Sequence, residues 1–338
     1  MNKIDLGYLE PCEKWQVESR LFPSKAGGKP AWLNLEGIPR GEDLLCSTCG
    51  ENLIFLCQIY APYEEDDNNF HRTLFIFICR NANCCIRNKS DNIRIFRSHL
   101  TRDNKFYPSD PPVEGPDPDF SLSKWSSICE ACGSFGDKKC SNCKVVTYCS
   151  RKHQIIHWKE NHKKTCGTKE NTSGDSSILF PEFEIVIEPE VLNVKEIDEE
   201  QEKQKFIELQ KQGKLGTMSD LDEEELTKHS TTSNDKMFAK FRKCVENNPE
   251  QVLRYSRGDQ PLLISDDIIP ENIPDCEYCG GPRQFEFQIM PQMLTFLKET
   301  QLDWGVLICY TCKFSCTDIN VDYKREFVFK QDVSLSNI

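Results

Sequence analysis

The chain of 338 residues has no long apolar run and few of the features that mark membrane or secreted proteins. No stretch approaches the roughly 20 apolar residues that cross a bilayer, and residues 1–10 lack the apolar core of a secretory signal. Basic residues are in deficit, with 42 Lys and Arg against 54 Asp and Glu and a net charge of −12. We therefore expect neither a membrane protein nor a secreted one.

The sequence also lacks the short motifs that most often mark an enzyme. It contains no glycine-rich cofactor loop, no nucleophile elbow and no metal motif with an open fourth position. Ser, His and Asp residues are present, but scattered residues of these types do not define a catalytic triad. We therefore expect a protein that is not an enzyme.

Cysteine, by contrast, is abundant, with 19 residues in the chain. An odd count leaves one thiol unpaired, and in a reducing compartment clustered cysteines hold metal more often than they form disulfides. Most of them fall into an N-terminal group (Cys46, Cys49, Cys79, Cys84 and Cys85), a central group from Cys129 to Cys166, and a C-terminal group (Cys276, Cys279, Cys309, Cys312 and Cys316). Zinc is therefore the first metal to consider.

Composition divides the chain into segments. Residues 107–119 are rich in proline, which indicates a linker rather than a helix or a central strand. Residues 171–235 hold 17 acidic and six basic residues, so they carry −11 of the net charge. Within them, residues 189–233 have few aromatic residues and cannot bury a core, so we predict an acidic, mostly disordered segment.

Two local elements are predicted beside this acidic segment. Before it, apolar and acidic residues alternate and predict a strand over 178–188. After it, the spacing of Phe238 and Phe241 predicts a helix, and Pro249 favours the first turn of a second short helix that runs to Tyr255.

Two distant stretches of the sequence are similar to each other. CSTCGENLIFLCQI at 46–59 matches CEYCGGPRQFEFQI at 276–289 at a constant offset of 230 residues, with six of 14 positions identical. Each stretch begins with a Cys-x-x-Cys-Gly knuckle and continues into a strand-like run. Further on, each is followed by a second strand-like run that leads into another cysteine pair. The sequence therefore predicts an internal repeat.

The repeat predicts two closed zinc sites. A knuckle supplies two thiolates from one tight turn, and a second pair from the end of a neighbouring strand completes a tetrahedron. We assign one site to Cys46, Cys49, Cys79 and Cys84, and the other to Cys276, Cys279, Cys312 and Cys316. A redox dithiol normally opens a helix, whereas both knuckles run into strand-like sequence, so these sites are expected to be structural.

Two alternatives remain for these cysteines. Cys85 can replace Cys84 as the fourth ligand of the first site, and both sets can also be read as buried thiols without metal. Cys57 and Cys309 lie within strand-like runs and are expected to be buried thiols outside the sites.

The central group has a dense ligand pattern, C-x2-C-x7-C-x2-C-x5-C-x3-H-x8-H-x3-C, from Cys129 to Cys166. Eight ligands in 38 residues suit two zinc ions, and so short a segment cannot fold on apolar burial alone. The pattern resembles the MYND finger, here over 124–168. The resemblance implies one zinc on Cys129, Cys132, Cys149 and His153, and another on Cys140, Cys143, His162 and Cys166. His153 stands where that family normally has cysteine, and His157 lies outside the ligand register.

The finger is basic, with a side-chain charge of +6 over residues 124–166. Two zinc sites, each with three thiolates and one imidazole, contribute about −1 each, which leaves about +4. A cationic face of this kind suits nucleic acid, although an ordinary solvated surface has the same composition. The MYND family mostly binds short proline-containing peptides, so we expect such peptides as partners rather than direct nucleic-acid binding. The linker of this chain itself can compete for such a groove.

Two knuckle-containing halves around an inserted finger resemble the programmed cell death protein 2 family, in its finger-bearing branch. The resemblance extends over nearly the full length. It is carried by GGKPAWL at 27–33, CQIYAP at 57–62, FHRTLFIFIC at 70–79, LFPEFEI at 179–185, PEQVLRY at 249–255 and LDWG at 302–305. It implies a dedicated chaperone that captures a newly made, basic small-subunit ribosomal protein for 40S ribosome biogenesis. The family is found in cytoplasm and nucleus and is linked to cell proliferation and apoptosis.

We therefore predict a β-rich α+β fold that binds about four zinc ions. Residues 1–120 and 234–338 are expected to form two pseudo-repeated zinc-knuckle halves of one core, with the finger inserted between them. The acidic segment suits a basic client, because opposite charge speeds encounter and shields the client. The alternative function is a nuclear transcriptional cofactor that recruits proline-rich partners through the finger.

Overall fold

The computed structural model describes residues 3–168, 176–191, 233–317 and 320–334. Most of the acidic segment predicted at 189–233 lies outside these residues. Strands dominate the described parts, and their helices are short and few. None of those helices combines the length and apolar character that a bilayer crossing requires.

Strands from both ends of the chain build one sheet. The strands before the finger are β1 (Asp5–Glu10), β2 (Lys25–Ala26), β3 (Ile54–Tyr60), β4 (His71–Ile78) and β5 (Ile93–Leu100). Those after it are β8 (Phe183–Pro189), β9 (Leu253–Tyr255), β10 (Arg283–Ile289), β11 (Val306–Cys312), β12 (Tyr323–Arg325) and β13 (Phe327–Gln331). They form an 11-stranded sheet in the order β12-β5-β4-β3-β2-β8-β1-β9-β10-β11-β13. Every neighbouring pair is antiparallel.

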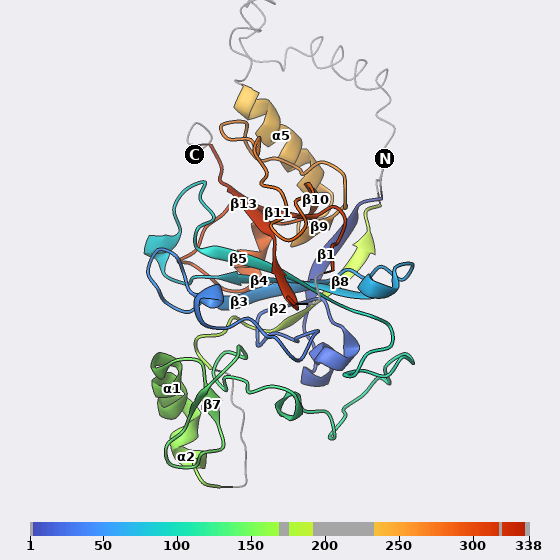
Figure 1. Cartoon of the computed structure of the whole chain (residues 1–338). Coiled ribbons are helices and arrows are strands. Elements are labelled where there is room, and N and C mark those ends of the chain that lie inside the picture. The colour runs from blue at the N-terminus through green and yellow to red at the C-terminus, as the bar shows by residue number, and fades with distance from the viewer. Residues whose placement is uncertain (1–2, 169–175, 192–232, 318–319, 335–338) are drawn as a thin grey trace, which may run out of the picture.

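One short segment joins the two ends of this sheet. β12 pairs with β5, and β13, which begins two residues after β12 ends, pairs with β11 at the opposite end. Glu326 lies between the two strands, and its amide N–H donates to the carbonyl of Ile95 on β5 at 3.0 Å. The sheet is therefore nearly closed, and its strands run through the middle of the molecule (Figure 1).

The main apolar core draws side chains from both halves. Leu56 and Ile76 from the N-terminal half and Phe287 from the C-terminal half are all fully buried in one cluster. Cys57 and Cys309 belong to the same cluster and are fully buried, as the sequence predicts for these two thiols. Burial raises the pKa of both thiols, so they stay protonated and apolar in character. The two halves therefore share one core.

β4 is buried on both faces, which explains its continuous apolar sequence. Leu74 and Ile76 face the shared core, whereas Phe75 and Phe77 point to the other side. There the ring centroid of Trp32 lies 5.1 Å from that of Phe75 and 5.7 Å from that of Phe77. A strand covered on both sides loses the alternation of a half-exposed strand.

The remaining regular elements are short, apart from one helix on the outside. This helix, α5 (Ser233–Glu246), contributes Phe238 and Phe241 to an apolar cluster that also contains residues of β10 and β11, and α6 (Gln292–Phe296) follows β10. The finger contains β6 (Lys138–Lys139), β7 (Thr147–Tyr148), α1 (Arg151–His157), a π-helical turn (Trp158–His162) and α2 (Lys163–Thr165). Short 3₁₀ turns occur at Lys14–Val17, Ser19–Leu21, Gly41–Leu44, Asp67–Asn69, Ala82–Cys84 and Leu122–Lys124.

The helix predicted from Pro249 to Tyr255 is wrong. Leu253–Tyr255 forms β9, which lies between β1 and β10 in the sheet. The amide of Val252 already donates to the carbonyl of Gly7 on β1 at 2.8 Å. Hydrogen bonds to two neighbouring strands outweigh the weak local preference for a helix.

The strand predicted over 178–188 is shorter at its start. β8 covers Phe183–Pro189, and the residues just before it make a different contact. The carbonyl of Phe180 accepts a hydrogen bond from Gly28 at 3.0 Å, and Pro181 has no N–H to donate to a neighbouring strand.

Cleavage within residues 192–232 should leave the two halves associated. The shared core would otherwise expose several large apolar side chains, each at a cost of about 1.5–3 kcal/mol. We expect a chain with a protease site inserted in this segment to elute as one species from a sizing column after cutting, at the volume of the uncut chain. Two separately eluting folded fragments would contradict the shared core.

Candidate metal centres

The structure gathers cysteines and histidines into four groups of four. In each group the ligand atoms all lie within 4.8 Å of one another. The groups are Cys46, Cys49, Cys79 and Cys84; Cys129, Cys132, Cys149 and His153; Cys140, Cys143, His162 and Cys166; and Cys276, Cys279, Cys312 and Cys316. These are the sixteen residues, in the same four sets, that the repeat and the resemblance to the MYND finger predict as zinc ligands.

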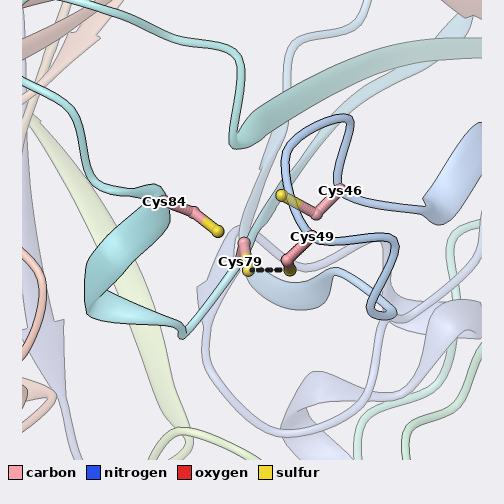
Figure 2. A group of neighbouring side chains, drawn as sticks. All are labelled: Cys46, Cys49, Cys79 and Cys84. Atoms are coloured by element: carbon pink, nitrogen blue, oxygen red, sulfur yellow. Dashed lines mark hydrogen bonds between the residues drawn. The ribbon is translucent and has the colours of Figure 1, made fainter.

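The N-terminal knuckle group forms where a tight turn meets the end of a strand. Cys46 and Cys49 lie in the turn before β3. The amide N–H of Gly50 closes this turn by donating a hydrogen bond to the carbonyl of Cys46 at 2.9 Å. Gly50 has a φ of +71°, a conformation that other residues resist. Cys79 directly follows β4, and Cys84 ends the 3₁₀ turn Ala82–Cys84. Figure 2 shows the four side chains turned toward a common centre.

The sulfur spacing in this group fits a tetrahedral metal rather than a disulfide. Cys49 Sγ and Cys79 Sγ are 3.7 Å apart. A disulfide needs about 2.05 Å, whereas four sulfurs each about 2.3 Å from zinc lie about 3.8 Å from one another. Burial raises the pKa of Cys46, but the backbone N–H groups of Cys49 and Thr48, together with the thiols of Cys79 and Cys49, outweigh it and hold that pKa at about 7. The turn thus favours the thiolate, which is the form that binds metal.

Cys85, the alternative to Cys84, has other partners in the structure. Its Sγ lies 3.1 Å from the carbonyl oxygen of Asp303 and 3.4 Å from the Asp303 amide nitrogen. Cys84, rather than Cys85, is the residue that lies within the group.

The C-terminal knuckle group has the same construction. Cys276 and Cys279 lie in the turn before β10, where Gly280 has a φ of +67° and donates to the carbonyl of Cys276 at 2.8 Å. Cys312 ends β11 and Cys316 follows it. The Sγ atoms of Cys276 and Cys316 are 3.7 Å apart, and those of Cys279 and Cys312 are 3.6 Å apart.

The finger contains two interleaved groups. In the first, the imidazole Nδ1 of His153 lies 3.1 Å from Cys149 Sγ, and Ser150 caps α1 by accepting the amide N–H of His153. This cap places His153 in the first turn of α1, next to Cys149. In the second group, His162 Nε2 lies 3.4 Å from Cys143 Sγ. His157 belongs to neither group, since its Nδ1 hydrogen bonds with the Tyr148 hydroxyl at 3.0 Å.

The four donor sets fit zinc. Each knuckle group offers four thiols, and each finger group offers three thiols and one imidazole, which are the soft, four-donor combinations of structural zinc sites. Four protein donors fill a tetrahedron and leave no position for a substrate or a reactive water. The ligands therefore support folding around a bound zinc ion rather than chemistry at it.

The finger is fixed to the N-terminal half by polar contacts as well as by the chain. The indole N–H of the fully buried Trp32 donates to the carbonyl of Gly133 at 2.7 Å. Lys152 pairs with Glu51, beside the N-terminal knuckle, at 2.8 Å. Trp32 is recognisable from the sequence only as part of GGKPAWL, because nothing in its local sequence shows which segment its indole contacts.

This arrangement defines a mostly β, metal-binding protein with an inserted zinc finger. Residues 129–166 match the family profile "MYND finger", and residues 3–114 match "Programmed cell death protein 2, N-terminal domain". Residues 235–332 match the profile of the C-terminal domain of that protein. The chain belongs to the programmed cell death protein 2 family.

Relatives of this chain match it over most of its length or over a part of it. "Programmed cell death protein 2" of Bos taurus is 41% identical over 348 residues, which covers 98% of this chain and 96% of that protein. "Programmed cell death protein 2-like" of Homo sapiens is 26% identical over 318 residues, covering 87% and 85%. "Probable 20S rRNA accumulation protein 4" of Schizosaccharomyces pombe is 32% identical over 121 residues, covering 32% and 31%. No solved structure matches the chain.

Native mass spectrometry should find four zinc ions on the intact chain, one for each group. The double variant Cys312→Ser/Cys316→Ser should lose one ion, because two remaining thiols cannot hold zinc tightly. Cys244 is on α5 and lies outside the four groups, so Cys244→Ser is the matched control and should keep all four zinc ions. A wild-type count of two, with both knuckles open to alkylation, would contradict the knuckle sites.

Trp32→Phe should loosen the attachment of the finger to the N-terminal half without loss of the zinc ions in the finger. The substitution keeps an aromatic ring but removes the hydrogen bond to Gly133, which is worth about 1 kcal/mol. We expect both finger zincs to remain and limited proteolysis between residues 121 and 128 to speed up about fivefold. Trp15→Phe, at a partly buried indole in the 3₁₀ turn Lys14–Val17 and outside the cleaved segment, is the control, and equal cleavage rates in the two variants would show that the contact does not hold the finger.

Proposed function

We propose that this protein is a zinc-stabilised, non-enzymatic chaperone for a basic small-subunit ribosomal protein in 40S ribosome biogenesis. The main support is its membership of the programmed cell death protein 2 family, together with a fission yeast relative named for 20S rRNA accumulation. The closed, four-donor metal groups agree with a binding role, since they offer no reactive position.

The charge distribution supports a basic client. Residues 171–235 carry −11 of the net charge of −12, so negative charge is concentrated in one stretch. Ribosomal proteins carry excess Lys and Arg, and an opposite charge speeds their encounter and shields them from RNA. In this proposal the acidic stretch attracts the client, and the sheet supplies an ordered contact.

The exposed end of β8 is the ordered contact that we favour. β8 pairs with β1 at six positions, but with β2 only at Phe183 and Glu184. Ile187, Glu188 and Pro189 are exposed at the end of the strand, directly before the acidic residues. An open strand edge can pair with an extended peptide, and Pro189, which has no N–H, keeps the open part short. A short basic segment of the client therefore suits this edge.

We also propose that the two halves descend from one duplicated unit. β3 and β10, the strands after the knuckles, carry a bulge at corresponding places, between Phe55 and Cys57 and between Phe285 and Phe287. Both pairs are related by the offset of 230 residues found in the sequence. Bulges are inherited features of a sheet more often than accidents, which favours a common origin.

Two buried glutamines, again 230 residues apart, support the same duplication. The side-chain amide of Gln58 accepts from the Ala31 N–H at 2.9 Å and donates to the Ala31 carbonyl at 3.1 Å. Gln288 makes the same two bonds with Leu262, at 2.7 and 3.1 Å. Ala31 and Leu262 each follow a proline, so the glutamines serve matching loops.

A second candidate function is a nuclear transcriptional cofactor that recruits proline-rich partners. It is favoured by apolar side chains exposed on the finger, Val145 and Ile155, which can contact such peptides. For the chaperone we propose a location in both cytoplasm and nucleus, with effects on cell proliferation and apoptosis that follow from ribosome supply.

A pull-down from translating cells tests the chaperone. The tagged chain should enrich one small-subunit ribosomal protein over an unrelated acidic protein that serves as the control. Cys140→Ser/Cys143→Ser, which empties one finger site, should keep that enrichment because the sheet and the acidic stretch bind the client. Loss of the ribosomal protein together with proline-rich partners would favour the cofactor, and no enrichment in the wild type would refute the chaperone.

A further inference from the structure

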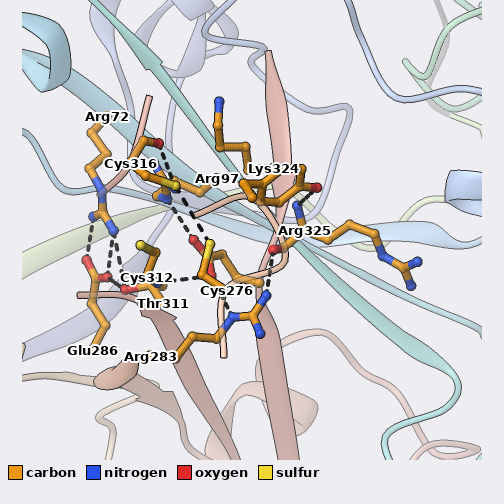
Figure 3. Close-up of polar contacts among 12 residues, drawn as sticks. Arg72, Arg97, Cys276, Arg283, Glu286, Thr311, Cys312, Cys316, Lys324 and Arg325 are labelled. Carbon is orange, nitrogen blue, oxygen red and sulfur yellow. Dashed lines mark hydrogen bonds and ion pairs between the residues drawn. The ribbon is translucent and has the colours of Figure 1, made fainter. Parts of the chain in front are cut away.

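The C-terminal knuckle group lies against a strand of the N-terminal half. Arg97 is on β5, and its guanidinium Nη2 lies 3.2 Å from the carbonyl oxygen of Cys316 and 3.7 Å from Cys316 Sγ. The Arg97 side chain is fully buried. Figure 3 shows Arg97 beside the cysteines of this group. A residue from one half therefore contacts a metal ligand of the other half directly.

The same arginine reaches a second ligand through an ion pair. Arg97 Nε donates to Glu326 Oε1 at 2.7 Å, and Glu326 Oε2 accepts the amide N–H of Cys312 at 3.0 Å. Glu326 Oε2 also accepts from Arg283 Nε at 3.0 Å. Two of the four sulfur ligands, Cys312 and Cys316, are thus held by one buried network.

Among the described residues, this network has an excess of positive charge that a charged metal group would offset. Arg97 and Arg283 against Glu326 leave one buried positive charge. Four thiolates with Zn²⁺ carry −2, which more than offsets this single positive charge, whereas four neutral thiols offset none of it. A buried cation without a counter-charge is strongly unfavourable. Arg97 Nη1 also finds no hydrogen-bond acceptor within the described ranges.

The N-terminal knuckle group has no matching contact across the halves within the part of the chain that the structure describes. Its nearby arginine, Arg94, comes from the same half and donates to the backbone carbonyls of Asp91 and Ile93, at 2.9 and 2.8 Å. All four of its cysteines also precede the finger. The two knuckle groups therefore differ in what holds them, and Arg94 provides a matched control for Arg97.

We propose that Arg97 is a positioning residue of the C-terminal zinc site, which makes zinc retention there depend on contact between the two halves. The guanidinium orients Cys316 and, through Glu326, the backbone of Cys312. Partners that orient metal ligands typically change metal affinity 10- to 100-fold. The inference rests on zinc occupancy of this group and is independent of the client.

Zinc release from the intact chain into a coloured chelator tests this proposal. Arg97→Lys keeps the charge but cannot span Cys316 and Glu326 at once, so one zinc of four should leave at least about tenfold faster. Alkylation of Cys312 and Cys316, followed by mass spectrometry, should identify the emptied site. Arg94→Lys should release all four at the wild-type rate. Unchanged release in a folded Arg97→Lys chain would overturn the proposal.

A reciprocal measurement covers the case in which Arg97→Lys does not fold. If zinc retention depends on contact between the halves, then loss of that zinc must weaken the contact by the same factor. Cys316→Ser should therefore speed hydrogen exchange along β5 in the N-terminal half, whereas Cys84→Ser should leave exchange along β11 in the C-terminal half unchanged. Unchanged protection of β5 in Cys316→Ser would show that the C-terminal site is independent of the N-terminal half.

Discussion

The segment of residues 323–331 joins the two halves, and the rest of the sheet depends on how it pairs. β12 adds to β5, β13 adds to β11, and Glu326 between them bonds to β5 through its backbone and to Arg97 through its side chain. Since buried backbone groups must find partners, the edge strand β5 of the N-terminal half depends on β12 of the C-terminal half for its hydrogen bonds. This segment therefore closes the sheet, and it contacts both the shared core and the C-terminal knuckle group.

The metal groups act where the sheet is most easily misaligned. Each knuckle begins β3 or β10, and the second cysteine pair follows the antiparallel neighbour, β4 or β11. A zinc ion at that point fastens the start of one strand to the end of the next and opposes a slip in register, which would turn buried side chains outward. Structural zinc sites are worth on the order of 10 kcal/mol in model peptides, comparable with the stability of a whole domain.

Local sequence predicted the metal groups better than the elements between them. The knuckle sets were expected from short spacings and the finger sets from the resemblance to the MYND finger, and the structure brings the same sixteen donor residues together, with Cys84 rather than Cys85 in the first group. The helix predicted to Tyr255 was wrong because β9 depends on β1 and β10, which lie far away in the chain. Trp32 and Arg97 were missed for the same reason, since their partners Gly133 and Cys316 are distant in sequence.

The sequence by itself determined the donor chemistry, the order of the segments, the concentration of negative charge and the resemblance to a family. These are properties of short stretches, where a few residues at set spacing decide the outcome. Only the tertiary structure decided that β12 and β13 lie at opposite ends of one sheet, that the finger rests on Trp32, and that Arg97 lies against the other half's metal group. The physical reason is that such contacts depend on which surfaces meet once the backbone hydrogen bonds and the packing of the core have both formed. No single segment of the sequence contains that information.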